Sequence, residues 1–396
     1  MMDVEVMMGE PDDEPGIDPT ETERQDPDEF FANNAFRVVY QTNNFFLPQI
    51  RDIIDKREVL NLRPEYQRRL RWSSVQKSRL IESLLLNIPV PPIFLYENDA
   101  ARYEVMDGQQ RLNAIHEFIA GDFALTGLTV LSPLNRLRYS RCPPRIKRAL
   151  DRASLSAIVL LLESEPEKIA GRLSLTDVRR FIFDRLNTGG TKLNAQEVRN
   201  ALNPGPLNDI IIELTREKLF TNVFNIPAYF ETNPNDYYEN QERQKNSIYS
   251  SMGDCQLVLR YFALKDPGNI RGSMKAMLDR AMNVEISKQQ AEDLKIEYNE
   301  RFSFLYELFE RRPFELPADD KGRVRVSAAI YDSSMVALNQ LWAQRELIKA
   351  DAVGVRDRMT AALKSGEHIT MLTGAGNTAK AVRERIELMR KILRPE

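Results

Sequence analysis

The stretch RYEVMDGQQRLNAIHEFIA, residues 102–120, decides the fold of the first half of the chain. Arg102–Met106 predicts a short strand, and Ile93–Glu97 predicts its partner strand across a polar turn. Directly after this hairpin, apolar residues recur at helical spacing, namely Leu112, Ile115, Phe118 and Ile119. The segment Asp107–Arg111 is therefore expected where a strand ends and a helix begins.

Helical patterns also precede and follow the hairpin. A first helix is expected over Leu47–Lys56. In the next helix Ser73 is the cap, Gln76 completes a capping box, and Pro89 ends the pattern. Three further elements are expected downstream: a buried strand at Leu155–Leu162 and helices at about 175–186 and 194–202.

Beyond Pro206 the sequence favours long helices and offers no expected strand. Apolar residues within 291–309 advance by three or four positions, which is typical of one helix face. Residues 326–345 and 378–393 are also expected to be helical, and residues 232–246 to form a surface loop. The whole pattern predicts an α+β protein with three parts: an acidic flexible arm (1–35), a mixed domain (36–205) and an all-α helical domain (206–396).

The charge is distributed unevenly along the chain. Residues 1–30 hold twelve acidic residues and one basic residue, Arg24, so this arm carries −11 and the remainder +8 of a net −3. Such a separation is typical of proteins with nucleotide or nucleic-acid partners, while a solvated tail on an ordinary domain is the alternative.

Composition excludes several classes of protein. Cys142 and Cys255 are too few for a disulfide framework, and with His116 and His368 they leave little material for a zinc site or a Ser-His triad. No apolar run is long enough to cross a bilayer, and the acidic start is unlike a secretory signal, so we expect a cytoplasmic protein without membrane contact. Its chemistry must then use Asp, Glu, Arg, Asn and Gln.

The segment Asp107–Arg111 carries the strongest chemical signal. Backbone N–H groups at a helix start favour an anion, Gly108 allows a close turn, and Arg111 can clasp a phosphate. Asp107 can bind Mg²⁺ or a ribose hydroxyl, and Gln109 or Gln110 can orient a water. The alternative is structural: a capping Asp, a turn Gly and a salt-bridged Arg.

Two basic stretches flank this segment in the sequence. Residues 63–79 carry a local charge of +5, with Tyr66 and Trp72 as stacking surfaces for a base; Trp72 is better explained as a core anchor. Residues 136–152 carry +6, which suits a solvated amphipathic helix after Pro144 and is also a candidate nucleic-acid surface.

A third segment, FIFDRLNTGGTKLNAQEVRN at residues 181–200, joins two expected helices through a glycine pair. Asn194 and Glu197 form a capping pair, which is an ordinary structural role. Asn187, Thr188 and Lys192 are expected on a loop that can donate hydrogen bonds to phosphate.

Four motifs occur in order: PEYQRR…W, IESLLLNIPVPPIFLY, DGQQRLNAI, and FxRLNTGG with LNAQEVRNA. Together they resemble the domain-of-unknown-function 262 family, over roughly residues 45–265. That family includes the N-terminal half of GmrSD-type modification-dependent restriction enzymes, and its core is similar to the ParB/sulfiredoxin fold. The resemblance implies a ParB-like mixed domain at residues 36–205 that binds nucleotides.

In these relatives the DGQQR element is associated with binding and hydrolysis of nucleoside triphosphates. The resemblance thus implicates Asp107, Gly108, Gln109, Gln110 and Arg111. From the other motifs it implicates Tyr66, Gln67, Arg68, Arg69 and Asn187.

Many of these relatives also carry a C-terminal HNH nuclease with a Glu-His-Ile-x-Pro sequence. Here Glu367-His368-Ile369 is followed by Thr370, and 28 residues remain after His368. We therefore expect no DNA cleavage by this chain itself, and a separate effector or nuclease protein as a partner.

Three functions remain open at this stage, of which the last is a degenerate family member kept for interactions alone. The first is Mg²⁺-dependent hydrolysis of a nucleoside triphosphate linked to DNA restriction or phage defence, with Asp107, Gln110 and Arg111 as catalytic residues. The second is a non-enzymatic DNA-associated or adaptor module of a defence system, in which the basic stretches grip nucleic acid.

Overall fold

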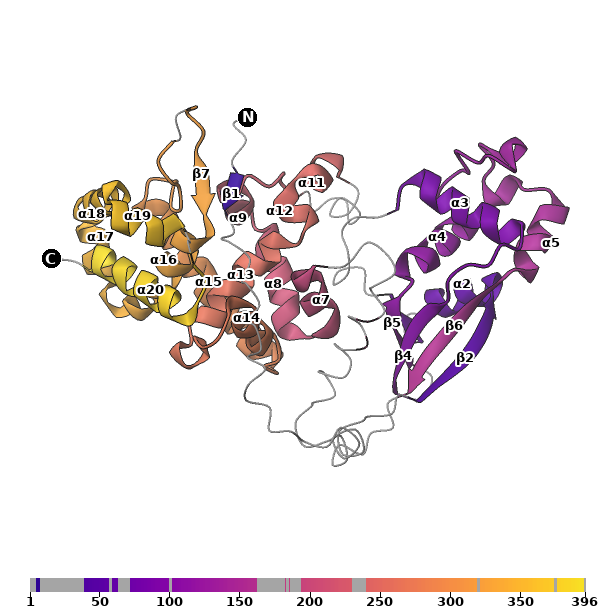
Figure 1. Cartoon of the computed structure of the whole chain (residues 1–396), viewed down its shortest axis with the longest axis horizontal. Helices are drawn as coiled ribbons and strands as arrows, with labels where there is room; N and C mark the ends of the chain where they lie inside the picture. Colours follow the sequence, from indigo (N-terminus) through magenta and orange to yellow (C-terminus); the bar gives the residue numbers. More distant parts are fainter. Residues whose placement is uncertain are drawn as a thin grey trace, which may run out of the picture. The chain divides into compact units, whose positions relative to one another are not determined.

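The computed structural model describes residues 5–7, 39–56, 59–62, 72–99, 102–161, 182, 185, 194–229, 240–318, 321–373 and 376–394. The chain divides into two compact units, one of residues 18–193 and one of residues 1–17 with 194–396 (Figure 1). The described part is a mixed α+β structure, as the sequence predicts.

The first unit is built on a five-stranded sheet in the order β2-β6-β4-β5-β3. Its strands are β2 (Val39–Phe46), β3 (Leu60–Asn61), β4 (Ile93–Asp99), β5 (Arg102–Asp107) and β6 (Ser154–Leu161). β4 pairs antiparallel with β5 and parallel with β6, while β6 pairs antiparallel with β2. The expected hairpin and the expected buried strand are confirmed.

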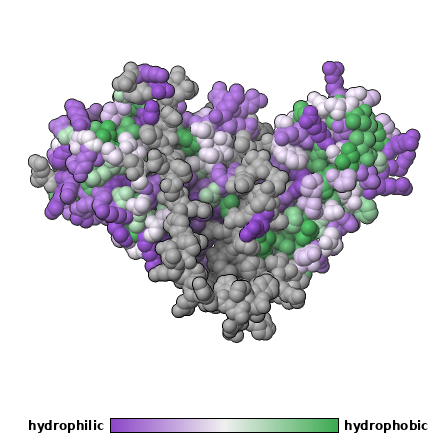
Figure 2. Space-filling view, in the orientation of Figure 1, coloured by the Kyte–Doolittle hydropathy of each residue, from purple (hydrophilic) through white to green (hydrophobic). Residues whose placement is uncertain are grey.

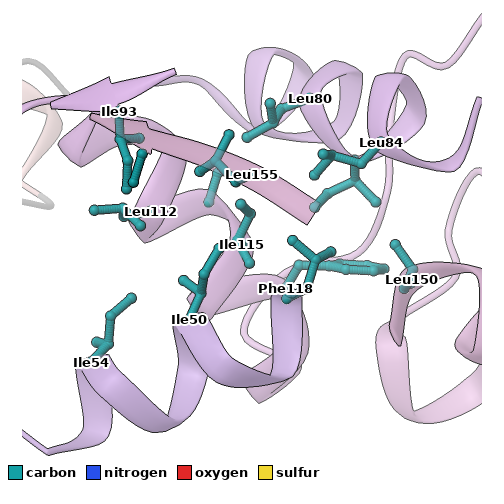
Figure 3. Packing of buried hydrophobic residues seen from close by; sticks show 14 of the residues in the cluster. Ile50, Ile54, Leu80, Leu84, Ile93, Leu112, Ile115, Phe118, Leu150 and Leu155 are labelled. Atoms are coloured by element: carbon teal, nitrogen blue, oxygen red, sulfur yellow. The ribbon is translucent and has the colours of Figure 1, made fainter. Parts of the chain in front are cut away.

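Four helices accompany this sheet: α2 (Leu47–Asp55), α3 (Ser74–Leu85), α4 (Gln109–Ala120) and α5 (Pro144–Arg152). Apolar side chains of the helices and alternate residues of the strands form one core, drawn in Figure 3. Phe118 of α4 and Leu155 of β6 are both about 1% exposed within it. Trp72 packs against this core, as expected for an anchor.

Local sequence accounts for where these helices begin. The Ser73 hydroxyl accepts from the Gln76 backbone, and the Gln76 side chain accepts from the Ser73 N–H, so the predicted capping box is present at α3. The same reciprocal pair joins Asn194 and Glu197 at the start of α7 (Ala195–Leu202). The expected helix at 175–186 lies largely outside the described residues.

The second unit is mainly helical. Besides α7, its helices of eight or more residues are α8 (Pro206–Arg216), α13 (Gly253–Leu264), α14 (Met274–Met282), α15 (Lys288–Leu308), α16 (Ala328–Gln340), α18 (Ala352–Lys364), α19 (Gly366–Thr373) and α20 (Ala379–Leu393). Shorter helices are α9 (Lys218–Val223), α11 (Gln241–Lys245), α12 (Ser247–Ser250) and α17 (Arg345–Ala350). Across the described part of the chain, no helix is both long enough and apolar enough to span a membrane.

The expectation of an all-α second domain needs a correction. Arg325–Ser327 forms strand β7, which pairs in parallel with β1 (Glu5–Met7) from the acidic N-terminal stretch. Residues 5–7 are the part of that stretch that the structure describes. The helix that was expected from Val326 onward, α16, begins two residues later, after β7. The expected loop at 232–246 contains the short helix α11. Three-residue strands and one-turn helices are too short for periodicity to identify them.

A charged cluster is buried in the helical unit between α13, α16 and α20. The Arg260 Nε lies 2.9 and 2.7 Å from the two carboxylate oxygens of Asp332, and both side chains are 2% exposed. Arg385 is equally buried; burial lowers its pKa to about 10, while Asp332 acts in the opposite direction. One carboxylate thus faces two buried guanidinium groups.

Replacing Asp332 by Asn should therefore destabilise the helical unit by about 3–5 kcal/mol, because two buried positive charges lose their counter-charge. The chain has two tryptophans, Trp72 and Trp342, one in each unit, so a Trp72→Phe background lets Trp342 fluorescence follow urea unfolding of the helical unit alone. Glu387→Gln, which breaks an exposed pair with Arg390, is the control and should change stability by less than about 0.5 kcal/mol. Equal effects of the two substitutions would contradict the prediction.

Candidate functional site

The strand-to-helix turn between β5 and α4 is set by Gly108. This residue has φ +97°, in the left-handed region, and a Cβ placed on it would lie 2.3 Å from the Ile93 Cγ2. Ile93 begins β4 next to the end of β5, and it belongs to the same core as Leu112 of α4 (Figure 3). Both the backbone angle and the lack of space therefore require glycine here.

This turn leaves the first turn of α4 with unused backbone donors. Gly108 is the N-cap and provides no side-chain hydrogen bond, and the first α4 N–H bonded within the helix is that of Leu112, which donates to the Gly108 carbonyl. The N–H groups of Gln109, Gln110 and Arg111 have no acceptor among the described residues. Such a helix start attracts an anion through its N–H groups and its dipole.

Asp107 and Arg111 form an ion pair across the same turn. The Arg111 Nη2 lies 2.5 Å from the Asp107 Oδ2, and Nη1 donates to the Pro91 carbonyl at 3.1 Å. The Arg111 side chain is 12% exposed and that of Asp107 is 39% exposed. These two contacts orient the Arg111 guanidinium and use two of its five N–H donors, so the others can bind a ligand. The Asp107 Oδ1 accepts from no described residue and can also contact a ligand.

Gln109 and Gln110 form hydrogen bonds with the backbone of Leu62 and Trp72, the positions on either side of residues 63–71. Gln109 is buried, and its Nε2 donates to the Leu62 carbonyl at 2.7 Å. The Gln110 Oε1 accepts from the Trp72 backbone N–H at 3.1 Å. The sequence did not reveal this structural role of the two side chains, because their partners lie 47 and 38 positions away in the chain.

The structure therefore brings together five sequence-predicted residues, Asp107 to Arg111, at one turn. Tyr66, Gln67, Arg68 and Arg69 lie outside the described residues, although the two chain positions that flank their segment, Leu62 and Trp72, are tethered to α4. Asn187, Thr188 and Lys192 also lie outside the described residues. Their predicted roles stay predictions.

The described end of the third motif lies in the helical unit. There Asn194 caps α7, and its Nδ2 also donates to the Ser251 carbonyl at 2.8 Å. A cavity of about 380 Å³ adjoins this cap, lined by Asn194, Ala195, Gln196, Ser247, Ile248, Ser251, Gly253 and Gln256. The structural role assigned to Asn194 and Glu197 is confirmed.

Metal-binding capacity at the turn rests on one carboxylate. Within the described residues, no three or more His, Cys, Asp or Glu side chains gather in a way that could hold a metal. Asp107 is partly exposed beside the donors of α4, which fits a Mg²⁺ that is held mainly by the phosphates of a nucleotide. Glu367 and His368 lie within helix α19 of the other unit.

Residues 50–203 match the family model of the GmrSD restriction endonuclease N-terminal domain. The match includes the β5–α4 turn and ends at the residue after α7. Neither the curated proteins nor the solved structures gave a significant match to this chain.

Substituting Gly108 by Ala should destabilise the first unit by about 3 kcal/mol. The energetic cost of a left-handed backbone at alanine and the cost of the clash between its Cβ and Ile93 add together. Gly121→Ala is the matched control: Gly121 caps the other end of α4 at φ +86° with nothing within 4 Å of a Cβ, so about 1 kcal/mol is expected. Urea unfolding followed by Trp72 fluorescence in a Trp342→Phe background measures both. Equal losses at the two glycines would show that Ile93 does not restrict position 108.

Proposed function

We propose that the β5–α4 turn of this GmrSD N-terminal-like domain binds a nucleoside triphosphate, and that the domain hydrolyses it in a restriction or phage-defence system. The observation that carries the proposal is the combination at one turn of three backbone N–H groups that have no acceptor among the described residues, an oriented arginine and a partly exposed carboxylate. This is the set of groups that phosphates require.

Each residue has a separate role in this proposal. The N–H groups of Gln109, Gln110 and Arg111 receive phosphate oxygens, and the Arg111 guanidinium neutralises their charge. Asp107 would hold a Mg²⁺ together with the phosphates, and the ion would lower the negative charge at the transferred phosphoryl group. Gly108 lets the phosphates approach the backbone closely.

Hydrolysis also needs an oriented water, which we assign to Gln110. Its Oε1 is already positioned by the Trp72 N–H, and this oxygen has a second lone pair that can accept from a water. The Gln109 side chain is committed to Leu62, so Gln109 contributes through its backbone N–H. Tyr66, Gln67, Arg68, Arg69, Asn187, Thr188 and Lys192 complete the proposed nucleotide site on the strength of their motifs alone.

Binding is tested by calorimetric titration with ATP, GTP, CTP or UTP in the presence of Mg²⁺. Arg111→Ala and Asp107→Ala should each raise the dissociation constant at least about tenfold, a loss near 1.4 kcal/mol. Asp55→Asn, which removes the negative charge 2.8 Å from the His116 Nε2 at the far part of α4, should leave the dissociation constant unchanged.

Unaltered urea unfolding of each variant, followed by Trp72 fluorescence, shows that the fold persists. Arg111→Lys provides a second variant if Arg111→Ala unfolds. No saturable binding of any nucleotide, or equal binding by both alanine variants and the parent, would remove the site assignment.

Turnover is tested by phosphate release under saturating nucleotide. Gln110→Leu should lower kcat at least about tenfold with little change in the dissociation constant, because it removes the water-orienting group. Gln109→Leu is its control, since it also breaks one contact to the chain beside 63–71 but removes no group from the proposed water. Nucleotide binding without turnover in the parent protein would favour the non-enzymatic adaptor function.

A further inference from the structure

A second charged surface lies apart from the nucleotide site, around α5 of the first unit. We define the arginine ridge as six exposed residues: Arg136, Arg138, Arg141, Arg145, Arg148 and Arg152. Figure 2 shows hydrophilic side chains along the right edge of the molecule, where Figure 1 places α5. We propose that this ridge binds the phosphate backbone of duplex DNA.

The helix geometry places the basic and apolar residues of α5 on opposite sides. Arg145, Arg148 and Arg152 advance by three and four positions, so at 3.6 residues per turn they share one face. Leu150, which is 1% exposed, anchors the opposite face in the core. The ridge is thus presented outward by a helix that is fixed from behind.

Ion pairs to the described residues of the unit do not offset the positive charge of the ridge. None of its six arginines forms an ion pair with another described residue. Arg138 donates to the Gly121 carbonyl, while the neighbouring Lys147 donates to the Ser140 carbonyl at 3.0 Å. The one acid of residues 136–152, Asp151, instead contacts the Tyr139 hydroxyl at 3.4 Å.

Like charges at these helical spacings oppose helix formation, by about 0.2–0.5 kcal/mol for each pair. Ordinary surfaces avoid this cost by interspersing both signs of charge. A phosphate backbone would supply the missing negative charge.

The start of the ridge is also held in an unusual backbone conformation. Arg136 has φ +71°, which is uncommon for a residue with a side chain. Its N–H donates to the Leu125 carbonyl at 2.7 Å, and the Leu125 N–H donates to the Leu137 carbonyl at 3.0 Å. These contacts fix the backbone at Arg136 a few residues before α5.

The residue types favour duplex DNA over other anionic partners. Proteins that bind single strands stack bases on exposed aromatic rings, but the one aromatic residue of this segment, Tyr139, is half-buried and packs against Phe118. A helix that binds a membrane surface exposes apolar residues beside its basic ones, whereas Leu150 of α5 faces the core. Guanidinium groups without stacking rings suit duplex phosphates and imply binding without base readout.

The test measures fluorescence anisotropy of a labelled duplex of arbitrary sequence, about 25 base pairs long, across salt concentrations and without nucleotide, so failure of the NTP site does not affect it. The triple variant Arg145→Gln, Arg148→Gln, Arg152→Gln should weaken binding about tenfold or more at moderate salt. It should also reduce the slope of log K against log salt by about 3, at roughly 0.9 for each phosphate contact.

The matched control changes the net charge equally in the other unit, through Arg271→Gln, Arg311→Gln and Arg390→Gln, and should bind DNA like the parent. An unchanged melting curve confirms that the exposed substitutions leave the fold intact. The proposal is overturned if the parent does not bind the duplex, if the two triple variants bind alike, or if the ridge binds anionic lipid vesicles or single strands in preference to the duplex.

Discussion

The contact between Gly108 and Ile93 is the constraint on which the first unit depends. Strand β4 begins where β5 ends, and a Cβ at position 108 would meet Ile93, so only glycine fits at the turn from β5 into α4. That geometry puts a carboxylate on the last strand residue and three backbone donors on the next turn. The core then fixes α4 through Leu112, Ile115 and Phe118, which are all about 1% exposed or less.

Local sequence predicted most of what is local in this structure. The capping boxes at Ser73 and Asn194 and the turn at Gly108 depend on neighbouring residues, and each lies where the sequence placed it. Strand β2 was not predicted, because its residues Gln41 to Asn44 are polar and show no strand pattern. This segment forms a strand by pairing with β6, more than a hundred positions later in the chain. The pairing of β1 with β7 is similarly non-local.

The same distinction applies to the candidate site. The residue types at Asp107–Arg111 indicated phosphate chemistry, whereas the partners of Gln109 and Gln110 required the folded chain. A glutamine can donate and accept at once, so its side chain is suited both to a ligand and to a backbone. Sequence alone cannot separate these uses, because the deciding atoms belong to Leu62 and Trp72.

The tethers at Leu62 and Trp72 have a consequence for variation of the chain between them. Leu62 and Trp72 are bound to Gln109 and Gln110, which are adjacent residues of one helical turn, so the two ends of the intervening segment are held close together. The entropy lost in closing a loop grows only with the logarithm of its length, and doubling the length costs about 0.6 kcal/mol. A change in the number of residues between Leu62 and Trp72 should therefore cost little stability, provided that both contacts to α4 are kept.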